Sequence, residues 1–264
     1  MIKVRDLWKS FGKLQVLKGL SLDIFEGETL VILGRSGVGK SVLLKQIMGL
    51  DYPDSGTVEI DGKKLADLSA QERRDHVMSM GMLFQGSALF DSMTVGENTG
   101  FYLSQHNDKD GKPYDEKSIK DRVSKALAMV DLKDTEHKMP SDLSGGMRKR
   151  AALARLIVYR PRILLYDEPT TGLDPITAMQ INELIKATQK ELGGTSIVVT
   201  HDIRSAAEIG DRLAFHHDGK IAYVGPKKEF FESKEPILKS FFENAILYPE
   251  TIKNITNSKP PSKD

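Results

Sequence analysis

The fold of this chain is decided by the stretch TLVILGRSGVGKS, residues 29–41. Residues 29–33 form an apolar run with the length of a buried strand, and residues 41–48 have the spacing of a helix. The glycine-rich segment between them satisfies GxxxxGK[ST]. In that context backbone N–H groups and the N-terminal end of the helix can cradle a phosphate. A glycine-rich turn before a helix remains the simpler alternative.

The residue types in this loop suit the triphosphate of a nucleotide. We expect Lys40 to reach the β- and γ-phosphates and the Ser41 hydroxyl to bind Mg²⁺. The candidate nucleotide-binding residues of the segment are Gly34, Arg35, Ser36, Gly37, Val38, Gly39, Lys40, Ser41 and Val42.

Strand-like runs return at residues 163–166 and 196–200, and a helical stretch at 176–191 separates them. Alternating strands and helices imply an α/β fold with a parallel sheet. Ligands collect at the carboxyl edge of such a sheet. Asp167 and Glu168 follow one strand and His201 follows the next, so we expect all three at the edge that carries Lys40.

Each of these polar residues has two interpretations, one catalytic or metal-binding and the other purely structural. Asp167 can hold Mg²⁺ and Glu168 can position or deprotonate water, although an Asp-Glu pair after a strand is often a solvated turn. Gln85 follows the apolar residues 81–84, where its amide could contact Mg²⁺ or the attacking water, or simply cap a strand. A lone histidine such as His201 is more often structural.

A second potential anion site precedes the helix expected at residues 147–159. The sequence there is LSGGM, residues 143–147. Ser144 can cap the helix while Gly145 and Gly146 expose N–H groups. Such a cap is also common without any ligand, and one nucleotide cannot easily use two anion sites far apart in one chain.

The composition excludes several classes of protein. With 38 Lys and Arg against 37 Asp and Glu, the formal net charge is +1, so nucleic-acid binding by sheer basicity loses support. The absence of cysteine excludes disulfides, thiolate catalysis and Cys-ligated zinc. The charged N-terminus is unlike a secretory signal, and no run approaches the roughly 20 apolar residues of a membrane-spanning helix. We therefore expect a cytoplasmic chain that depends on another subunit for any spanning helices.

Taken together, the motifs resemble those of the ATP-binding subunit of ABC transporters, over nearly the whole chain to about residue 243. The family's Walker A, Q-loop, signature, Walker B, D-loop and H-loop match, in this order, residues 34–41, Gln85, 143–147, 163–168, 172–174 and His201. The resemblance implies a P-loop NTPase (RecA-like) core with a parallel sheet, an antiparallel β subdomain and an inserted helical subdomain. It predicts an ATPase domain at 1–245, with the core at 1–85 and 161–245 and the helical subdomain at 86–160. The tail, 246–264, is expected to contact a partner subunit.

The resemblance also explains the two anion sites. In this family two subunits pack head to tail, so that Lys40 of one chain and Ser144, Gly145 and Gly146 of the other face the same ATP. It implies that Phe11 stacks on adenine, with Trp8 as the competing candidate, and that Asp174 lies at the nucleotide.

The catalytic roles that the resemblance implies fall on four residues. Glu168 activates water, His201 and Lys40 stabilise charge on the γ-phosphoryl group, and Gln85 contacts the metal or the water. The implied Mg²⁺ ligands are Ser41, Gln85 and Asp167.

Three segments resemble a subfamily, the ATPases associated with MCE proteins, of which the Mla-type phospholipid-transport ATPases are members. They are LFQGSALF at 83–90, LSGGMRKR at 143–150 and GLDPI at 172–176; Met147 stands where the usual signature has Gln. This resemblance implies phospholipid transport between bacterial membranes by a homodimer bound to an integral-membrane permease dimer, an MCE lipid-binding subunit and, in some cases, a STAS-domain subunit, without nucleic acid. It places the chain peripherally on the inner face of the cytoplasmic membrane.

Two other functions stay open. One is the ATPase of a small-molecule ABC importer or exporter. The other is a non-transport ABC ATPase acting on nucleic acid or ribosomes, which the single set of motifs and the modest helical insertion disfavour.

Overall fold

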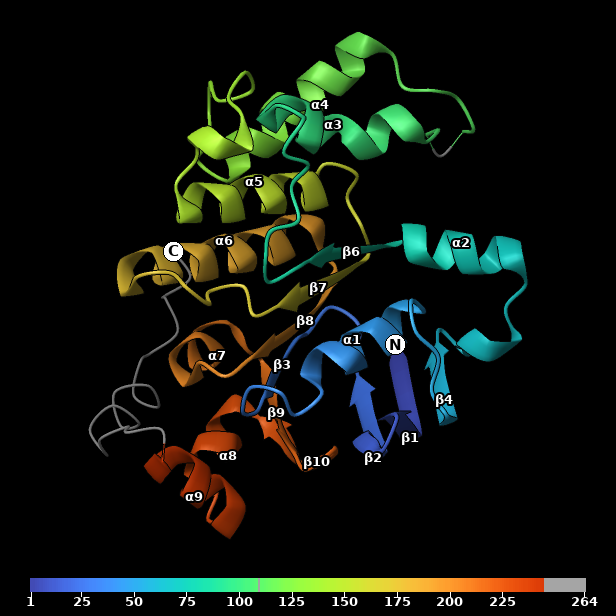
Figure 1. The fold of residues 1–264 in the computed structure, drawn as a ribbon, viewed down its shortest axis with the longest axis vertical. Coiled ribbons are helices and arrows are strands. Elements are labelled where there is room, and N and C mark those ends of the chain that lie inside the picture. Colours follow the sequence, from blue (N-terminus) through green and yellow to red (C-terminus); the bar gives the residue numbers. More distant parts are fainter. Residues whose placement is uncertain (109, 245–264) are drawn as a thin grey trace. The chain divides into compact units, whose positions relative to one another are not determined.

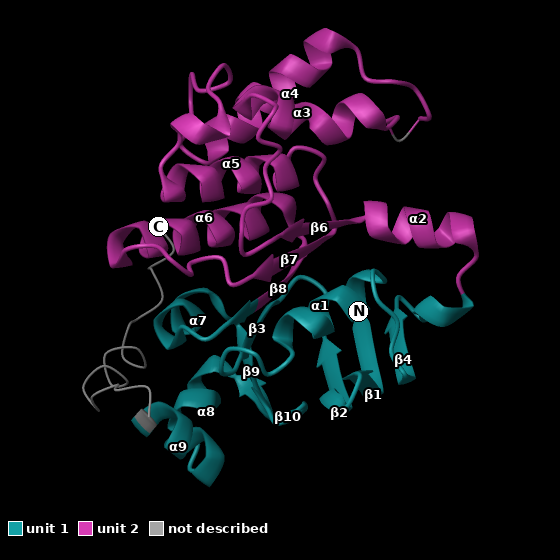
Figure 2. Ribbon diagram, viewed as in Figure 1, with its two compact units in different colours: residues 1–67, 199–264 teal, residues 68–198 magenta. Residues whose placement is uncertain are grey.

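The structure is a computed structural model that describes residues 1–108 and 110–244 (Figure 1). The chain divides into two compact units, one with residues 1–67 and 199–264 and the other with residues 68–198 (Figure 2). The predicted boundaries between core and helical subdomain, at 85/86 and 160/161, do not coincide with this division and stay a prediction. The predicted tail, 246–264, lies outside the described residues.

The first unit contains an antiparallel sheet with the order β2-β1-β4-β5. Its strands are β1 (Ile2–Phe11), β2 (Leu14–Ile24), β4 (Ser55–Ile60) and β5 (Lys63–Lys64). Val4 is paired with Leu22 on one side and with Val58 on the other, and all three side chains are buried. Buried side chains at paired positions are typical of strands with one face in the core, and the antiparallel β subdomain that the resemblance implies is confirmed.

The first unit also holds the strand of the deciding stretch. All five residues of β3 (Thr29–Leu33) are buried, as expected for a strand covered on both faces. It pairs in parallel with β9 (Arg212–His217), which pairs antiparallel with β10 (Lys220–Pro226). The helices of this unit are α1 (Lys40–Met48), α7 (Ile203–Ile209), α8 (Lys227–Glu232) and α9 (Pro236–Asn244), with a 3₁₀ turn at Leu65–Asp67.

The second unit combines short strands with most of the long helices. Its strands are β6 (Met80–Leu83), β7 (Ile163–Asp167) and β8 (Thr195–Thr200), in the order β8-β7-β6; β8 runs on into the first unit at residue 199. β6 and β7 are parallel. With the β3–β9 pair, this confirms the predicted α/β class.

The helices of the second unit are α2 (Ala70–Met78), α3 (Val95–Gln105), α4 (Glu116–Met129), α5 (Gly145–Ile157) and α6 (Pro175–Leu192), with a 3₁₀ turn at Pro140–Asp142. α3, α4 and α5 pack on one another (Figure 1). The helices predicted at 147–159 and 176–191 are thus confirmed within two residues at each end. Side-chain caps fix three starts: Asp115 for α4, Ser144 for α5 and Asp174 for α6.

No helix among the described residues is long and apolar enough to cross a lipid bilayer.

Candidate nucleotide site

The glycines of the loop after β3 are required by close backbone contacts. A Cβ at Gly34 would lie 2.6 Å from the carbonyl oxygen of His216, and a Cβ at Gly39 would lie 2.5 Å from Cγ1 of Val16. Gly39 also has φ +105°, a conformation that L side chains rarely adopt. Both positions therefore require glycine, and the N–H groups of such a loop can bind an anion.

Lys40 spans this loop from the first turn of α1. Its side chain is 5% exposed, and its ammonium group donates hydrogen bonds to the carbonyl oxygens of Gly34 (2.8 Å) and Arg35 (2.9 Å). The positive charge thus lies at the loop, where the N-terminal end of α1 adds its own positive potential. A loop of this kind attracts phosphate.

A buried histidine lies beneath the loop and was not anticipated from the sequence. His216 of β9 is 1% exposed, and neither ring nitrogen has a hydrogen-bond partner among the described residues. Burial first, and then the positive charges of Lys40 and His217, together lower the pKa of His216 to about 4. The imidazole is therefore neutral at neutral pH, so Lys40 supplies the positive charge here.

His201 belongs to the same unit as the loop. It follows β8, its side chain is exposed, and the preceding residue, Thr200, accepts a hydrogen bond from the N–H of Gly34 (3.3 Å). The backbone therefore joins the start of the loop to the residue before His201, as the shared sheet edge predicts.

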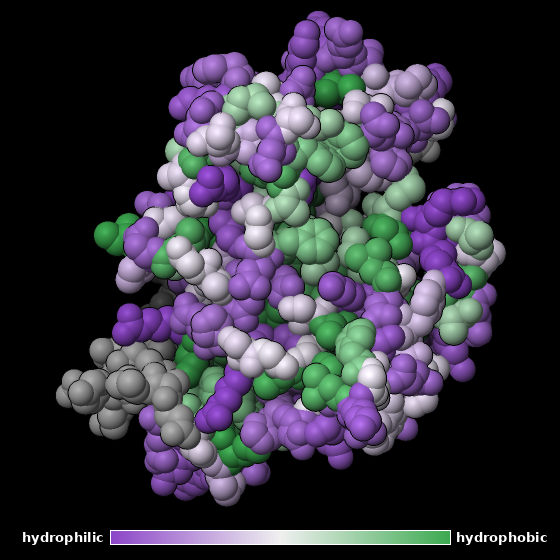
Figure 3. All heavy atoms as spheres, viewed as in Figure 1, coloured by the Kyte–Doolittle hydropathy of each residue, from purple (hydrophilic) through white to green (hydrophobic). Residues whose placement is uncertain are grey.

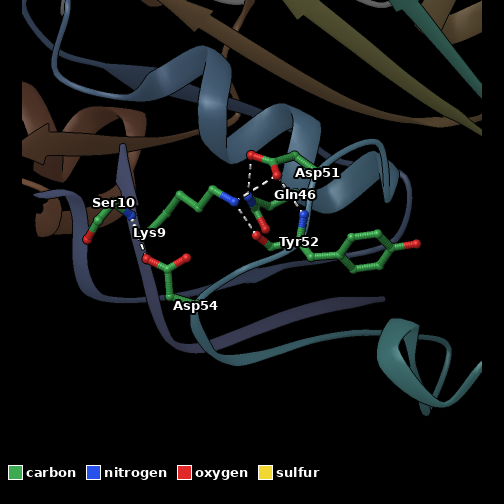
Figure 4. Close-up of polar contacts among 6 residues, drawn as sticks. All are labelled: Lys9, Ser10, Gln46, Asp51, Tyr52 and Asp54. Atoms are coloured by element: carbon green, nitrogen blue, oxygen red, sulfur yellow. Dashed lines mark hydrogen bonds and ion pairs between the residues drawn. The ribbon is translucent and has the colours of Figure 1, made fainter. Parts of the chain in front are cut away.

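The strand that carries Trp8 and Phe11 is tied to the far end of α1 (Figure 4). Lys9 forms an ion pair with Asp51 (2.7 Å), and Asp51 accepts a hydrogen bond from the amide of Gln46 on α1 (3.0 Å). No sequence motif marks this network. It fixes β1 to the helix that begins at Lys40.

The two aromatic candidates differ in exposure. The Phe11 ring is 52% exposed, and Lys9 Nζ lies 5.4 Å from its centroid. Trp8 is only half-exposed, and its indole N–H donates to Asp6 (3.1 Å). Phe11 is thus the ring with the more accessible face.

In the second unit the carboxylates lie where β7 ends. Asp167 is its last residue, Glu168 follows, and each is only 7% exposed. Glu168 has φ +48° and accepts a hydrogen bond from the Thr171 hydroxyl (3.1 Å). A non-glycine residue in this region stores strain and is typical of functional positions. The pair is therefore not a solvated turn.

Gln85 follows β6, and its side chain is exposed. Its carbonyl oxygen accepts a hydrogen bond from the ammonium group of Lys149, a buried residue of α5. No sequence motif marks Lys149, which stands between Arg148 and Arg150 in the sequence.

The signature segment and Asp174 form one cluster around Thr177 of α6. The Ser144 hydroxyl accepts the Met147 N–H (3.3 Å), and a Cβ at Gly146 would lie 2.6 Å from Cγ2 of Thr177. Asp174 accepts hydrogen bonds from the hydroxyl (2.6 Å) and N–H (3.0 Å) of Thr177, and these bonds lower the pKa of Asp174. Close helix packing therefore requires the glycine, and Ser144 and Asp174 act as helix caps.

The structure brings the predicted residues together in two groups. The first unit holds Phe11, the loop residues 34–42 and His201; the second holds Gln85, residues 144–146, Asp167, Glu168 and Asp174. Within the described parts of the chain, no three His, Asp or Glu side chains form a ready metal cluster. The hydroxyl of Ser41 and the carboxylate of Asp167 are nevertheless the oxygen donors that Mg²⁺ prefers, and the glycine loop fits a nucleotide phosphate.

Comparison with known proteins agrees with this chemistry. The family model described as ABC transporter matches residues 17–171. The chain is 41% identical to protein TRIGALACTOSYLDIACYLGLYCEROL 3, chloroplastic, of Arabidopsis thaliana, over 94% of the chain and 75% of that protein. It is 38% identical to the probable ribonucleotide transport ATP-binding protein mkl of Mycobacterium leprae, over 94% of the chain and 70% of that protein. The methionine import ATP-binding protein MetN of Clostridium tetani is 39% identical, over 97% of this chain and 78% of that protein.

Solved structures of ATP-binding cassettes have the same fold. The dimeric ATP-binding cassette MJ0796, in a post-hydrolysis state bound to ADP and phosphate, gives a TM-score of 0.78 at 33% identity, over 86% of this chain and 99% of that one. The structure of cbiO1 from Clostridium perfringens gives a TM-score of 0.79 at 34% sequence identity, over 96% of this chain and 98% of that one. This chain belongs to the ABC transporter family, and it is an ATPase with a P-loop NTPase fold.

Proposed function

We propose that this ABC ATPase powers the transport of phospholipid between bacterial membranes, together with an integral-membrane permease dimer and an MCE lipid-binding subunit. The observation that carries the proposal is the 41% identity, over 94% of the chain, to a relative named after a diacylglycerol lipid. The three segments that resemble MCE-associated ATPases support it. A STAS-domain subunit is a possible further partner, and residues 246–264 are the proposed contact with a partner subunit.

The proposed catalytic cycle assigns one task to each group of residues. The loop residues 34–42, with Lys40, hold the phosphates, and Phe11 stacks on the adenine with its exposed face. Ser41, Gln85 and Asp167 hold Mg²⁺, which neutralises charge on the phosphates. Glu168 accepts the proton of the attacking water, while His201 and Lys40 stabilise charge on the transferring phosphoryl group.

A head-to-tail homodimer gives residues 144–146 and Asp174 a role beyond helix capping. Ser144 and Gly145 are exposed, so both can face the nucleotide of a partner subunit. One similar structure is a dimer bound to ADP and phosphate, which supports this arrangement. In this proposal the chain lies on the inner face of the cytoplasmic membrane, because its permease carries the spanning helices.

Import of a small molecule is the second candidate. It is favoured by the relatives named for methionine import and for ribonucleotide transport, at 39% and 38% identity. The catalytic roles would be the same, and only the permease and its cargo would differ.

Isolation of the intact transporter separates the two candidates. The tagged chain is purified from native membranes in mild detergent, its partners are identified by mass spectrometry, and the complex is reconstituted with phospholipid or with methionine. We expect a permease and an MCE protein to co-purify, and phospholipid to stimulate ATP turnover. Stimulation by methionine with no MCE partner would overturn the lipid proposal. Glu168→Gln controls for contaminating ATPases.

A further inference from the structure

Lys149 occupies an unusual position for a lysine. It lies on α5 with 5% of its surface exposed, and its ammonium group donates to the carbonyl oxygen of Gln85. Two negative charges act on it, those of Asp167 and Glu168. Burying an ammonium group costs several kcal/mol unless it is paired. The hydrogen bond to the Gln85 carbonyl therefore pairs the buried ammonium group, and the carboxylates of Asp167 and Glu168 add a favourable field.

The positive charge of Lys149 and the negative charges of Asp167 and Glu168 stabilise one another. Burial lowers the pKa of Lys149, and the fields of Asp167 and Glu168 oppose that shift. The two carboxylates are themselves only 7% exposed, and a nearby cation stabilises negative charge in a medium that screens poorly.

The loop that Lys149 contacts is strained. Ser87 and Ala88 have φ +65° and +50°, and non-glycine residues pay about 1 kcal/mol each for a left-handed conformation. Arg155, also on α5, donates to the carbonyl oxygens of Ser87 (3.2 Å) and Ala88 (2.7 Å). Two cations of one helix thus hold residues 85–88, and Lys149 is the one that also acts on the carboxylates.

We propose that Lys149 is a positioning residue for ATP hydrolysis. Its ammonium group fixes the backbone at Gln85 to α5 and balances the charge of Asp167 and Glu168, so that the loop, the signature helix and the carboxylates keep one arrangement during turnover. The inference rests on the hydrolytic roles proposed above for Gln85 and Glu168. It gives α5, which begins at the Ser144 cap, a direct connection to the hydrolytic residues of its own chain.

The test compares Lys149→Met, which keeps the length of the side chain without its charge, with Lys149→Arg, which keeps a cation and its donors. In the full-length chain we expect Lys149→Met to lower kcat about 10- to 100-fold with KM for ATP within about twofold of wild type. Lys149→Arg should restore kcat to within about threefold. Lys190→Met, on the exposed side of α6, is the matched control and should leave both constants unchanged.

Hydrogen exchange without nucleotide supplies a readout independent of activity. The Ser87 N–H is bonded to the Phe84 carbonyl (3.0 Å), and its exchange should accelerate in Lys149→Met and return to the wild-type rate in Lys149→Arg. Should Lys149→Met fail to fold, Lys149→Gln removes the charge in its place and the same loss of kcat at constant KM is expected.

Unchanged kcat in the charge-removing variant would overturn the proposal. So would a parallel loss of kcat and ATP affinity that Lys149→Arg does not rescue, because that pattern is plain destabilisation. Glu168→Gln is measured in the same series. If it retains wild-type turnover, the proposed role of Glu168 fails; if it loses turnover while Lys149→Met does not, only the role of Lys149 fails.

Discussion

Two loops follow strands of this chain, and they hold their shape by different means. The loop 34–39 after β3 relies on its own glycines, with φ +79° at Gly37 and +105° at Gly39. The loop 85–88 after β6 has positive φ at Ser87 and Ala88 instead. Its carbonyls are held by side chains of α5, 64 to 68 residues later in the chain. The first loop owes its left-handed turns to glycines, whereas the second adopts them with non-glycine residues whose carbonyls are held by a distant helix.

This difference suits the tasks proposed for the two loops. A phosphate cradle must have the same geometry in each catalytic cycle, and its glycines adopt the left-handed conformations that this geometry needs without strain. The loop at Gln85 adjoins the residues proposed to hydrolyse ATP, and it is held by the helix that begins at the Ser144 cap. A loop braced from a neighbouring helix can respond to that helix.

Adding a methyl group to the first loop is expected to have the largest effect on folding. Gly39→Ala should lower the free energy of unfolding by about 3 kcal/mol, because the new Cβ meets Val16 and the backbone is strained. ATP affinity should fall with it. Gly27→Ala is the control: its φ is +75° with nothing within 4 Å of the added Cβ, so strain alone should cost about 1 kcal/mol. Equal losses in urea titrations of the two variants would contradict a cost from the contact between residue 39 and Val16.

Acidification should lower the free energy of unfolding through His216, which lies against Gly34 of the first loop. The pKa of His216 is about 4 in the fold and about 6.5 in the unfolded chain. The unfolded state therefore binds a proton that the folded state does not, and stability present above pH 6.5 is lost as the pH falls towards 4, by at most about 3 kcal/mol. His216→Leu should flatten this slope in denaturation curves, whereas His137→Gln, at an exposed position, should keep it. An unchanged slope in His216→Leu would rule out this histidine as the cause.

Removing a brace should loosen the second loop and leave the first intact. Arg155→Met leaves the carbonyls of Ser87 and Ala88 without their charged donor, at a cost of about 2 kcal/mol. Arg160→Met removes an exposed arginine paired with Glu191 and should cost less than about 0.5 kcal/mol. Hydrogen exchange should accelerate at 86–88 in the Arg155 variant, and not at 34–39. Faster exchange at both loops would show that they are not independent.

Relieving the strain of the second loop should give the smallest effect, with the opposite sign. Ala88→Gly removes an alanine from the left-handed conformation and so relieves about 1 kcal/mol of strain. Because glycine also gives the unfolded chain more conformational freedom, the net rise in the free energy of unfolding should be about 0.5 kcal/mol. Ala187→Gly, in the middle of α6, should lower it by about 1 kcal/mol. Destabilisation by both glycines in thermal melts would mean that Ala88 is not strained.

The same contrast explains what the sequence could predict. The phosphate loop, its strand and helix, and the ends of the helices α4, α5 and α6 follow from local patterns of glycines, caps and apolar spacing. Lys149 and His216 could not be found in this way, because their roles depend on burial and on partners far away in sequence. The ion pair of Lys9 with Asp51, which anchors β1 to α1, has no pattern for the same reason. The roles of Gln85, Glu168 and His201 stay predictions that the geometry supports.

The central claim is that the first loop binds ATP and the carboxylates after β7 hydrolyse it. ATP binding and turnover, measured side by side on Lys40→Met and Glu168→Gln, test this most directly. The account predicts that Lys40→Met loses most of its ATP affinity, while Glu168→Gln binds ATP like the wild type and turns it over about 10²- to 10⁴-fold more slowly. Near-normal turnover by Glu168→Gln, or wild-type binding by Lys40→Met, would contradict it.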